Sequence, residues 1–369
     1  MSSDIERDVK RDVEAAARRI AAHGFSTAGG RSWTMPDEIF IALLGRVRGE
    51  RLEGLLLQAA RDGAVSLTDI QLAAVGADHR SEMEQVLRLE RVALDVTRRL
   101  ADHGIRAVVL KGVALANSIY RDPSIRLFGD VDVLIEPGRF AATIDVLVSR
   151  GGLREVPEVR PGFDERFAKD VPFSVDGMAV DLHRTLIRGP FGVRIPVAAL
   201  LAASRPLELG DGALHILAPS DAYVFAALTA GAADVPARLL TLRDLLELER
   251  APGFDVDAIL RAARRWAVEA ALARAIVVLD ARLRPDRPPG LLSWARSFRP
   301  RPLDRFYMGC YTSSARSYRS TMATLVALER WSDRGRLAWA MLVPQRSYRD
   351  ARGWSFGDHV RRGIRKLRR

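Results

Sequence analysis

The sequence predicts an α+β protein, in which a small mixed β-sheet core with helices is flanked by N-terminal and C-terminal helical regions. Three observations support this fold class. Apolar residues recur at helical spacing through the first hundred residues, short β-branched runs alternate with helical segments in the middle of the chain, and helical periodicity then returns. With 369 residues, 48% of them hydrophobic, the chain can form two or three domains with cores of their own.

We divide the chain into four segments on this basis. Residues 1–104 are expected to form an N-terminal helical region, and residues 105–217 the sheet core. Residues 218–290 are expected to form a C-terminal helical region, and residues 291–369 a mixed, mostly helical tail with a basic end.

Three helices are expected in the first segment. The first carries apolar residues on one face between residues 5 and 20. The second starts near Phe40 and continues without a break to Gly63, and the third spans residues 81–103.

The second segment is expected to contain a compact β-α-β-α-β-β unit. Its elements are a strand at 105–110, a helix at 113–120, a strand at 129–135, a helix at 139–150, and strands at 171–175 and 178–183. Asp176 and Gly177 lie between the last two strands, and an Asp-Gly pair in that position is a strong hairpin signal. The stretch before residue 171 is expected to be irregular.

The signals are weaker further along the chain. Residues 206–217 are expected to form a second hairpin that turns at 210–212. Ser220 and Asp221 are expected to cap a helix, after which helical periodicity continues through residue 283. Residues 284–305 are rich in Pro and Arg and are expected to form a loop.

Composition excludes several classes of protein. The most apolar run near the C-terminus, residues 337–343, is far shorter than the roughly 20 residues that a bilayer requires. The N-terminus is charged and lacks the apolar segment of a signal peptide. The single cysteine, Cys310, excludes an intrachain disulfide framework and a cysteine-based zinc cluster. We therefore expect a cytoplasmic protein without a membrane span.

The net charge of +11 is concentrated at the C-terminus. Residues 344–369 contain nine Lys and Arg residues against two Asp residues. Such a tail can bind nucleic acid or an anionic membrane surface. The favoured interpretation is a solvated, partly helical C-terminus, because charge runs are usually solvated.

Two aspartates, Asp130 and Asp132, interrupt an otherwise apolar strand. Side chains two apart on a strand point to the same face and lie about 7 Å apart along the chain. Two like charges at this spacing repel each other unless a positive charge lies between them, and a divalent metal ion is a common solution. The sequence therefore predicts a metal site on this strand.

Other polar residues support this prediction. Asp181 and His183 share one face of the last strand of the unit, and three strand aspartates on one side of a sheet can hold two divalent ions. Lys111 and Gly112 lie at a strand-to-helix turn, where a glycine allows close approach to a phosphate and the lysine adds a positive charge. Arg126 is a second candidate for neutralising phosphate charge.

These motifs together resemble the bacterial uncharacterised nucleotidyltransferase family, within the polymerase-β-like nucleotidyltransferase superfamily. The superfamily pattern is a strand and glycine-containing turn, a helix, a strand with Asp-x-Asp, and a third acidic residue on a later strand. The narrower family carries LKG, a helix ending in Tyr, an Arg, the Asp pair and a V-D-[LI]-H segment, which stand here at 110–112, Tyr120, Arg126, 130–132 and 180–183.

The resemblance implies a reaction and a cofactor. The reaction is the transfer of a nucleoside monophosphate from an NTP, with ATP as the first choice, to a hydroxyl or similar group on a small molecule, peptide or protein, with release of pyrophosphate. The cofactor is Mg²⁺, as two ions, with Mn²⁺ as the alternative. Asp130 and Asp132 would bridge both ions, and Asp181 would bind the catalytic ion and help to deprotonate the acceptor.

The resemblance also assigns the neighbouring residues. Lys111, Gly112, Arg126 and Gly129 lie on the nucleotide side, and His183 and Asp244 are candidates for the acceptor side. The superfamily's usual Gly-Ser pair at the strand-helix turn is replaced here by Lys111 and Gly112, a change that the narrower family shares. How the γ-phosphate is held is therefore left open.

Each candidate also has a purely structural interpretation. Lys111 can extend from its turn into solvent, Arg126 can form a structural ion pair with Asp130 or Asp132, and a lone strand histidine such as His183 is more often structural than catalytic. Tyr120 is expected to pack in the core. Two other functions stay open: a nucleotide-binding module that has lost catalysis, and a nucleic-acid-binding protein that uses the basic tail.

Overall fold

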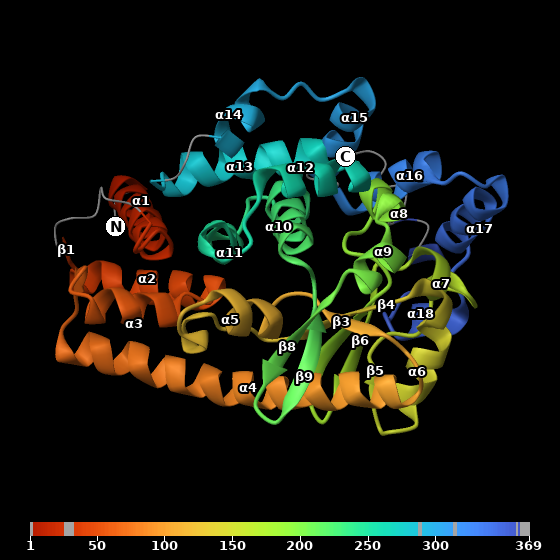
Figure 1. The fold of residues 1–369 in the computed structure, drawn as a ribbon, viewed down its shortest axis with the longest axis horizontal. Helices are drawn as coiled ribbons and strands as arrows, with labels where there is room; N and C mark the ends of the chain where they lie inside the picture. Colours follow the sequence, from red (N-terminus) through yellow and green to blue (C-terminus); the bar gives the residue numbers. More distant parts are fainter. Residues whose placement is uncertain (1–2, 26–32, 287–289, 313–315, 359–360, 362–369) are drawn as a thin grey trace.

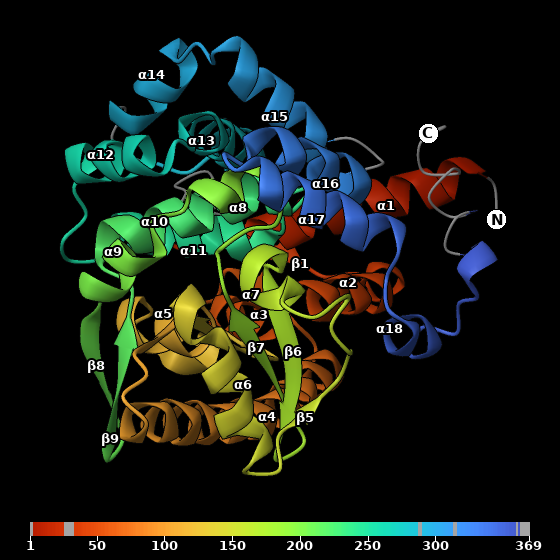
Figure 2. The ribbon, with the colours of Figure 1, turned by 90° about the vertical axis from the view of Figure 1, so that its right-hand side faces the viewer.

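The structure, a computed structural model, describes residues 3–25, 33–286, 290–312, 316–358 and 361. A seven-stranded mixed sheet lies in the middle of the molecule, with helices over both of its faces (Figures 1 and 2). Helices from the N-terminal and C-terminal parts of the chain pack against each other in one hydrophobic cluster. The predicted α+β class, with helical regions on both sides of the sheet core, is confirmed.

The strand order is β5–β6–β7–β4–β3–β9–β8. The pairs β4–β7 and β3–β9 are parallel, and the other neighbours are antiparallel. The strands span Ala107–Val109 (β3), Val131–Ile135 (β4), Leu153–Arg154 (β5), Asp170–Val175 (β6), Met178–His183 (β7), Arg205–Leu209 (β8) and Gly212–Ile216 (β9). Two further short strands, β1 (Trp33–Thr34) and β2 (Val65–Ser66), pair with each other in parallel.

The central strand β4 is buried on both faces, and its alternation positions the acidic site. Val131, Val133 and Ile135 belong to a hydrophobic cluster with α4 (Asp69–Asp102) and α6 (Phe140–Val148). Leu134 points to the opposite face, into the cluster that contains the N-terminal and C-terminal helices. Asp132 shares this second face with Leu134 because side chains two apart on a strand point the same way.

The N-terminal helices differ from the prediction in two places. The expected second helix is two helices, α2 (Asp37–Glu50) and α3 (Glu53–Arg61), because Arg51 adopts a left-handed conformation with φ of 58°. The N–H groups of Arg51 and Leu52 bond back to Arg48 and Val47, the pattern of a Schellman motif that ends a helix. The expected third helix, α4, begins at Asp69 rather than residue 81.

A capping box sets the early start of α4. The hydroxyl of Thr68 accepts a hydrogen bond from the N–H of Gln71, and the Gln71 side chain accepts one from the N–H of Thr68. The first helix, α1 (Ser3–Ala21), lies where it was predicted.

The elements of the core segment follow the prediction closely. Helix α5 (Val113–Ile119) follows β3, a 3-10 turn (Pro123–Ile125) leads to β4, and a second one (Pro137–Arg139) leads into α6. The hairpin β6–β7 turns at Asp176 and Gly177, whose φ angles of 51° and 76° suit a type I′ turn. The stretch expected to be irregular contains the short strand β5 and α7 (Phe163–Phe167).

The second hairpin, β8–β9, is also confirmed and lies beside β3. The next helix, α10 (Pro219–Leu228), begins at Pro219 without a side-chain cap, so the predicted cap by Ser220 and Asp221 was wrong. Proline suits the first turn of a helix because its missing N–H would have no partner there. Asp221 instead pairs with Arg265 at 2.7 Å.

The loop expected at 284–305 contains a helix, α14 (Gly290–Ser297), and the first turn of α15 (Pro302–Thr312). Helix α14 forms because Leu291 and Ala295, four residues apart, are both buried on one face, and Arg296 pairs with Asp280 of the preceding helix. Residues 287–289 of that expected loop lie outside the described residues.

The remaining helices cover the face of the sheet that carries Asp132 and form the C-terminal part of the structure. They are α8 (Pro190–Arg194), α9 (Val197–Ala202), α11 (Leu239–Arg250), α12 (Val256–Trp266), α13 (Glu269–Leu283), α15 (Pro302–Thr312), α16 (Arg316–Ala327), α17 (Trp331–Leu342) and α18 (Arg346–Asp350), with a π-helical turn at Thr229–Ala233. Helix α17 packs against α7, so the last helices lie beside the β6 side of the sheet (Figure 2).

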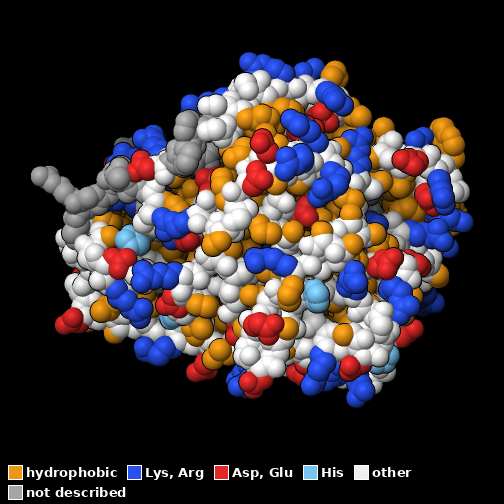
Figure 3. All heavy atoms as spheres, in the orientation of Figure 1, with side chains coloured by type: hydrophobic (Ala, Val, Ile, Leu, Met, Phe, Trp, Pro, Cys, Tyr) orange, Lys and Arg blue, Asp and Glu red, His pale blue; other side chains and the backbone are white. Residues whose placement is uncertain are grey.

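Most of the basic C-terminus lies outside the described residues, including Arg362, Arg365, Lys366, Arg368 and Arg369. On the face of the molecule that Figure 3 shows, Lys and Arg side chains are interspersed with acidic ones rather than gathered in one patch. Within the described ranges, no helix has both the length and the apolar character needed to cross a bilayer.

Candidate active site

A row of charged side chains crosses four neighbouring elements on one face of the sheet. It runs from Asp170 on β6, through Asp181 and His183 on β7, to Asp132 on β4 and Lys111 after β3. The strand register creates this row, since Asp132 is paired with Asp181 and Asp170 with His183. Adjacent strands lie about 4.8 Å apart, so groups in such a row can reach the same ligand.

Asp132 lies at the centre of the row and is 1% exposed. Its Oδ1 atom is 2.7 Å from Nε2 of His183, and its Oδ2 atom is 3.1 Å from Nζ of Lys111. Burial alone would raise the pKa of Asp132, but Lys111 and His183 lower it below the ordinary value. Asp132 is therefore ionised at neutral pH.

The hydrogen-bond partners of His183 indicate how its two ring nitrogens are used. Nδ1 lies 3.2 Å from the carbonyl oxygen of Thr185, which can only accept a hydrogen bond. Nε2 faces the ionised carboxylate of Asp132, which is also an acceptor. We therefore assign a proton to Nδ1, which donates to Thr185, and Nε2 is the ring nitrogen that faces Asp132 and could bind a metal ion.

The surroundings of Asp181 raise its pKa, whereas those of Asp132 lower its pKa. Burial, together with the nearby carboxylates of Asp170, Asp132 and Asp130, raises the pKa of Asp181 to about 6 against the opposing effect of His183. Three carboxylates around a fourth create a strongly negative site. A cation would relieve this repulsion.

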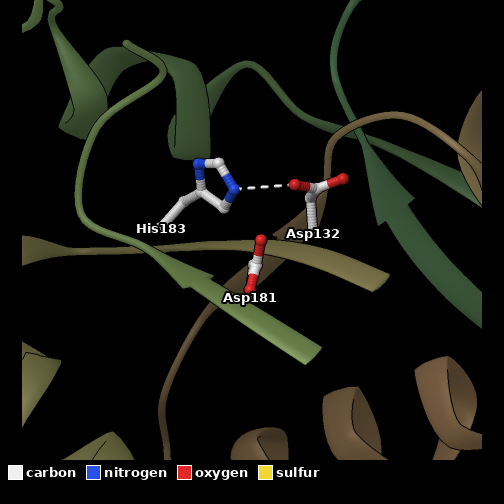
Figure 4. A group of neighbouring side chains, drawn as sticks. All are labelled: Asp132, Asp181 and His183. Atoms are coloured by element: carbon white, nitrogen blue, oxygen red, sulfur yellow. Dashed lines mark hydrogen bonds and ion pairs between the residues drawn. The ribbon is translucent and has the colours of Figure 1, made fainter. Parts of the chain in front are cut away.

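The residues present fit a divalent cation. One donor atom each from Asp132, Asp181 and His183 lies within 4.8 Å of the others, and Figure 4 shows the three side chains converging. Asp132 Oδ2 is buried and accepts no hydrogen bond of good geometry, although Lys111 Nζ lies within ion-pair distance. Two carboxylates and an imidazole can bind several divalent ions, among which Mg²⁺ prefers oxygen ligands.

Asp130 lies outside this group of three. It precedes β4, its side chain is 39% exposed, and its Oδ2 atom is 3.8 Å from Nζ of Lys111. Asp130 and Asp132 thus point to the same side, as predicted from their spacing. The positive charge between them in this structure is the Lys111 ammonium, whose pKa the two aspartates raise against the effect of burial.

Arg126 and Asp244 form a buried ion pair with each other. Nη2 of Arg126 is 2.8 Å from Oδ2 of Asp244, and the hydroxyl of Tyr120 donates to Oδ1 of Asp244 at 2.8 Å. Arg126 also donates to the carbonyl of Leu127. The structural partner of Arg126 is therefore Asp244, and not Asp130 or Asp132, and Asp244 lies on the Lys111 side of the row rather than beside His183.

A cavity of about 230 Å³ opens at the Lys111 end of the row, and we call it the lysine cavity. The residues predicted on the nucleotide side all line it, namely Lys111, Gly112, Arg126 and Gly129, together with Asp130 and Asp244. Gly112 has a φ of 55°, which favours glycine, and a Cβ at Gly129 would lie 1.9 Å from the Arg51 guanidinium.

Sequence reasoning missed three charged residues around the site. Arg51 and Arg238 line the lysine cavity, and Asp170 lies 4.0 Å from His183 Nε2. Arg51 reaches the cavity only because of the left-handed break between α2 and α3. Asp170 could have been found by extending the hairpin register by one residue, since it then pairs with His183.

A model of the family described as uncharacterised nucleotidyltransferase matches residues 42–284, about two thirds of the chain. The chain belongs to this family. It is therefore a nucleotidyltransferase, an enzyme that acts on nucleoside triphosphates. The match includes every residue of the charged row and ends before α14. No curated protein matches the chain significantly.

Proposed function

We propose that this nucleotidyltransferase moves a nucleoside monophosphate, with ATP as the first candidate donor, to a hydroxyl or similar acceptor and releases pyrophosphate. The observation that carries the proposal is the charged row itself. It combines carboxylates on adjacent strands with an ammonium beside a cavity, in a chain of this family. Nucleotidyl transfer needs both elements, because phosphoryl groups are positioned and stabilised mainly by charge.

The lysine cavity suits the triphosphate of the donor. Lys111 supplies a positive charge at its inner end, and Arg51 and Arg238 supply two more on its walls. Arg51 and Arg238 are only weakly held by carboxylates, at 3.3 Å from Glu82 and 3.7 Å from Glu50, so phosphate oxygens can compete for them. Gly112 and Gly129 let the backbone approach the ligand closely.

The acidic residues supply the metal site in this proposal. Asp132 and Asp181 would hold Mg²⁺ or Mn²⁺ with Asp130, as predicted, and His183 would be a further ligand or would orient Asp132. A bound divalent ion would neutralise phosphate charge and stabilise the attacking and leaving oxygens. The imidazole among the donors favours Mn²⁺ over Mg²⁺.

The proton of the acceptor hydroxyl needs a base near the point of attack. Asp181 is the candidate, since its carboxylate lies in the middle of the row, on the strand next to Asp132. Asp170, on the neighbouring strand β6, lies on the side of Asp181 that is away from Lys111. The acceptor would therefore approach from the β6–β7 side.

A donor panel tests this proposal. The purified protein is incubated with each of the four α-³²P-labelled NTPs, with Mg²⁺ or Mn²⁺, and with a small-molecule extract as the source of acceptors. We expect a labelled product and one pyrophosphate per label transferred with at least one NTP, and neither in Asp181→Asn. Asp145→Asn, an exposed aspartate of α6, is the matched control and should keep full activity. Absence of transfer with every NTP and both metals would reject the proposal.

A further inference from the structure

A second cavity, of about 390 Å³, opens at the opposite end of the charged row, and we call it the β6 cavity. One wall is the sheet edge, with Lys169 and Asp170, and the loop that carries Arg188. The other wall comes from the last helices of the chain, through Leu337 of α17 and Tyr348 of α18. This second wall lies outside the part of the chain that the family model matches, whereas the first wall lies inside it.

The β6 cavity reaches the reaction centre through Asp170. Oδ2 of this residue lies 4.0 Å from Nε2 of His183, which itself contacts Asp132. The lysine cavity reaches the same centre from the other end, through Lys111 and Asp130. The centre therefore lies between two cavities.

This arrangement matches the geometry that nucleotidyl transfer requires. The attacking and leaving oxygens must lie on opposite sides of the α-phosphorus. With the leaving pyrophosphate in the lysine cavity, the attacking group enters from the side of Asp170. That side is the β6 cavity.

The cations around the β6 cavity indicate the chemistry of its ligand. Two are neutralised within the protein, since Lys169 pairs with Asp170 and Arg154 with Asp164. The other two are Arg188 and Arg352, and neither guanidinium has a carboxylate within 4 Å in the part of the chain that the structure describes. Arg188 helps to lower the pKa of Asp170, but neither arginine forms an ion pair among the described residues, and two such guanidinium groups favour an anionic group on the ligand.

The positions of these two arginines are supported by their surroundings. The hydroxyl of Tyr311 donates to the carbonyl oxygen of Arg188 at 2.5 Å. The guanidinium of Arg352 lies over the rings of Tyr348 and Trp354, at 5.1 and 5.5 Å. The backbone of Arg188 and the guanidinium of Arg352 are thus held near the cavity.

Between the charges, part of the lining is apolar and part is polar, including Thr321 and Thr324. The rings of Phe163 and Phe167 pack against each other at a tilt of 57°, with their centres 5.5 Å apart. Val156, Val159 and Leu337 lie around the same space. The C-terminal wall is fixed to the core by a hydrogen bond of 2.9 Å from Gln345 to Val159 and by an ion pair of 3.7 Å between Arg166 and Asp333. The cavity is of the size that accommodates small molecules.

We propose that the β6 cavity is the acceptor subsite, and that the acceptor is a small molecule with a hydroxyl group, an apolar body, and a carboxylate or phosphate that binds Arg188 and Arg352. This inference rests on the proposed function. The acceptor oxygen forms a bond to the α-phosphorus, the bond from that phosphorus to the bridging oxygen breaks, and pyrophosphate leaves with the electron pair. The hydroxyl proton passes to a carboxylate of the row.

Binding to the full-length protein tests the proposal with matched anionic and neutral probes. The carboxylate pair is 3-phenyllactate and its methyl ester, and the phosphate pair is glycerol 3-phosphate and glycerol, measured by calorimetry. We expect at least one anion to bind about tenfold more tightly than its neutral partner, the contribution of one good charge-assisted contact. The pair that shows the preference identifies the anionic group.

Three variants locate the binding. Arg188→Gln and Arg352→Gln should each weaken the preferred anion by about tenfold and leave its neutral partner unchanged. Arg346→Gln is the matched control, because this arginine lies on α18 with its side chain 87% exposed and does not line the cavity. Equal binding of anion and neutral partner in both pairs, or unchanged anion binding in Arg188→Gln and Arg352→Gln, would overturn the proposal.

ATP binding, measured in the same samples, distinguishes a failure of the acceptor proposal from a failure of the proposed function. Arg188→Gln and Arg352→Gln should bind ATP as the unsubstituted protein does, since both lie at the β6 end of the row. If the unsubstituted protein binds ATP but shows no preference for either anion, the acceptor proposal alone fails. If it binds no ATP with Mg²⁺ or Mn²⁺, the proposed function fails and the acceptor proposal fails with it.

Discussion

The ammonium of Lys111 lies 3.1 Å from Oδ2 of Asp132, at the position where the sequence alone suggested a metal ion. This oxygen is buried and accepts no hydrogen bond of good geometry, so the contact is purely electrostatic. Such a contact is easily exchanged when a second cation or a phosphate arrives. We therefore expect the Lys111 ammonium to turn toward the phosphates when a metal ion and a nucleotide bind.

Replacing Lys111 by methionine should change metal and nucleotide binding in opposite directions. Without the ammonium, Asp130 and Asp132 repel each other and bind a divalent ion more tightly, whereas the triphosphate loses a positive partner. We expect Mn²⁺ to bind about tenfold more tightly and ATP about tenfold more weakly, each close to one charge-assisted contact. Electron paramagnetic resonance of free Mn²⁺ measures the Mn²⁺ affinity, and calorimetry measures the ATP affinity. Lys10→Met, on the exposed side of α1, is the control, and a weaker Mn²⁺ affinity in Lys111→Met would contradict this account.

Divalent ions should stabilise the folded protein through Asp181 and His183. An ion that binds only the folded state raises the melting temperature with concentration, and at one hundred times its Kd the gain is about 2.7 kcal/mol. We expect Mn²⁺ to raise the Tm of the unsubstituted protein and of Asp145→Asn, and to have little effect on Asp181→Asn or His183→Gln. A scan at several Mn²⁺ concentrations measures this. An equal Mn²⁺ shift in all four proteins would place the ion elsewhere.

The Arg126–Asp244 pair should matter mainly for stability. Both side chains are buried, so Arg126→Met leaves the Asp244 carboxylate without its positive partner and should cost about 3–5 kcal/mol. Arg126→Met combined with Asp244→Leu removes both charges and should recover most of that loss. Urea unfolding of the two single variants and the double variant gives their free energies of unfolding, which form a double-mutant cycle with the unsubstituted protein. Additive losses would show that the pair is not coupled.

Glu53 of α3 should make stability depend on pH. Burial, with Glu82 and Asp78 nearby, raises its pKa from the ordinary 4.5 to about 7 in the folded protein. The folded state therefore disfavours the ionised form, so this residue costs nothing below about pH 4.5, and the cost grows until it is complete above about pH 7.

Glu53→Gln should remove that cost. Relative to the unsubstituted protein, we expect the variant to gain about 2 kcal/mol more at pH 8 than at pH 5, after allowing for solvent screening. Urea unfolding at the two pH values measures the difference. Glu84→Gln, on the exposed side of α4, is the control. A gain of equal size at both pH values would show that Glu53 does not titrate in this range.

The sequence was informative where local chemistry decides the structure. The hairpin at Asp176 and Gly177 follows from a turn that needs two positive φ angles, and its register then aligns Asp181 with Asp132. The alternation along β4 likewise places Asp132 on the face opposite its apolar neighbours.

The residues that were missed depend on contacts that no local pattern shows. Arg51 reaches the lysine cavity through a left-handed break, at a position where an uninterrupted helical period had been expected. Arg126 pairs with Asp244, which lies 118 residues further along the chain. The C-terminal helices form a wall of the β6 cavity through contacts such as Gln345 to Val159, which sequence periodicity does not indicate.

If the charged row transfers nucleotides, Asp132→Asn should lose an activity that the unsubstituted protein has. Both are assayed for pyrophosphate release and label transfer from α-³²P-labelled ATP with Mg²⁺ and Mn²⁺, in the presence of the same acceptor mixture. Circular dichroism and ATP binding show whether the variant is folded. The account predicts transfer by the unsubstituted protein and a loss of roughly a thousandfold or more in folded Asp132→Asn. Full transfer by Asp132→Asn would contradict it.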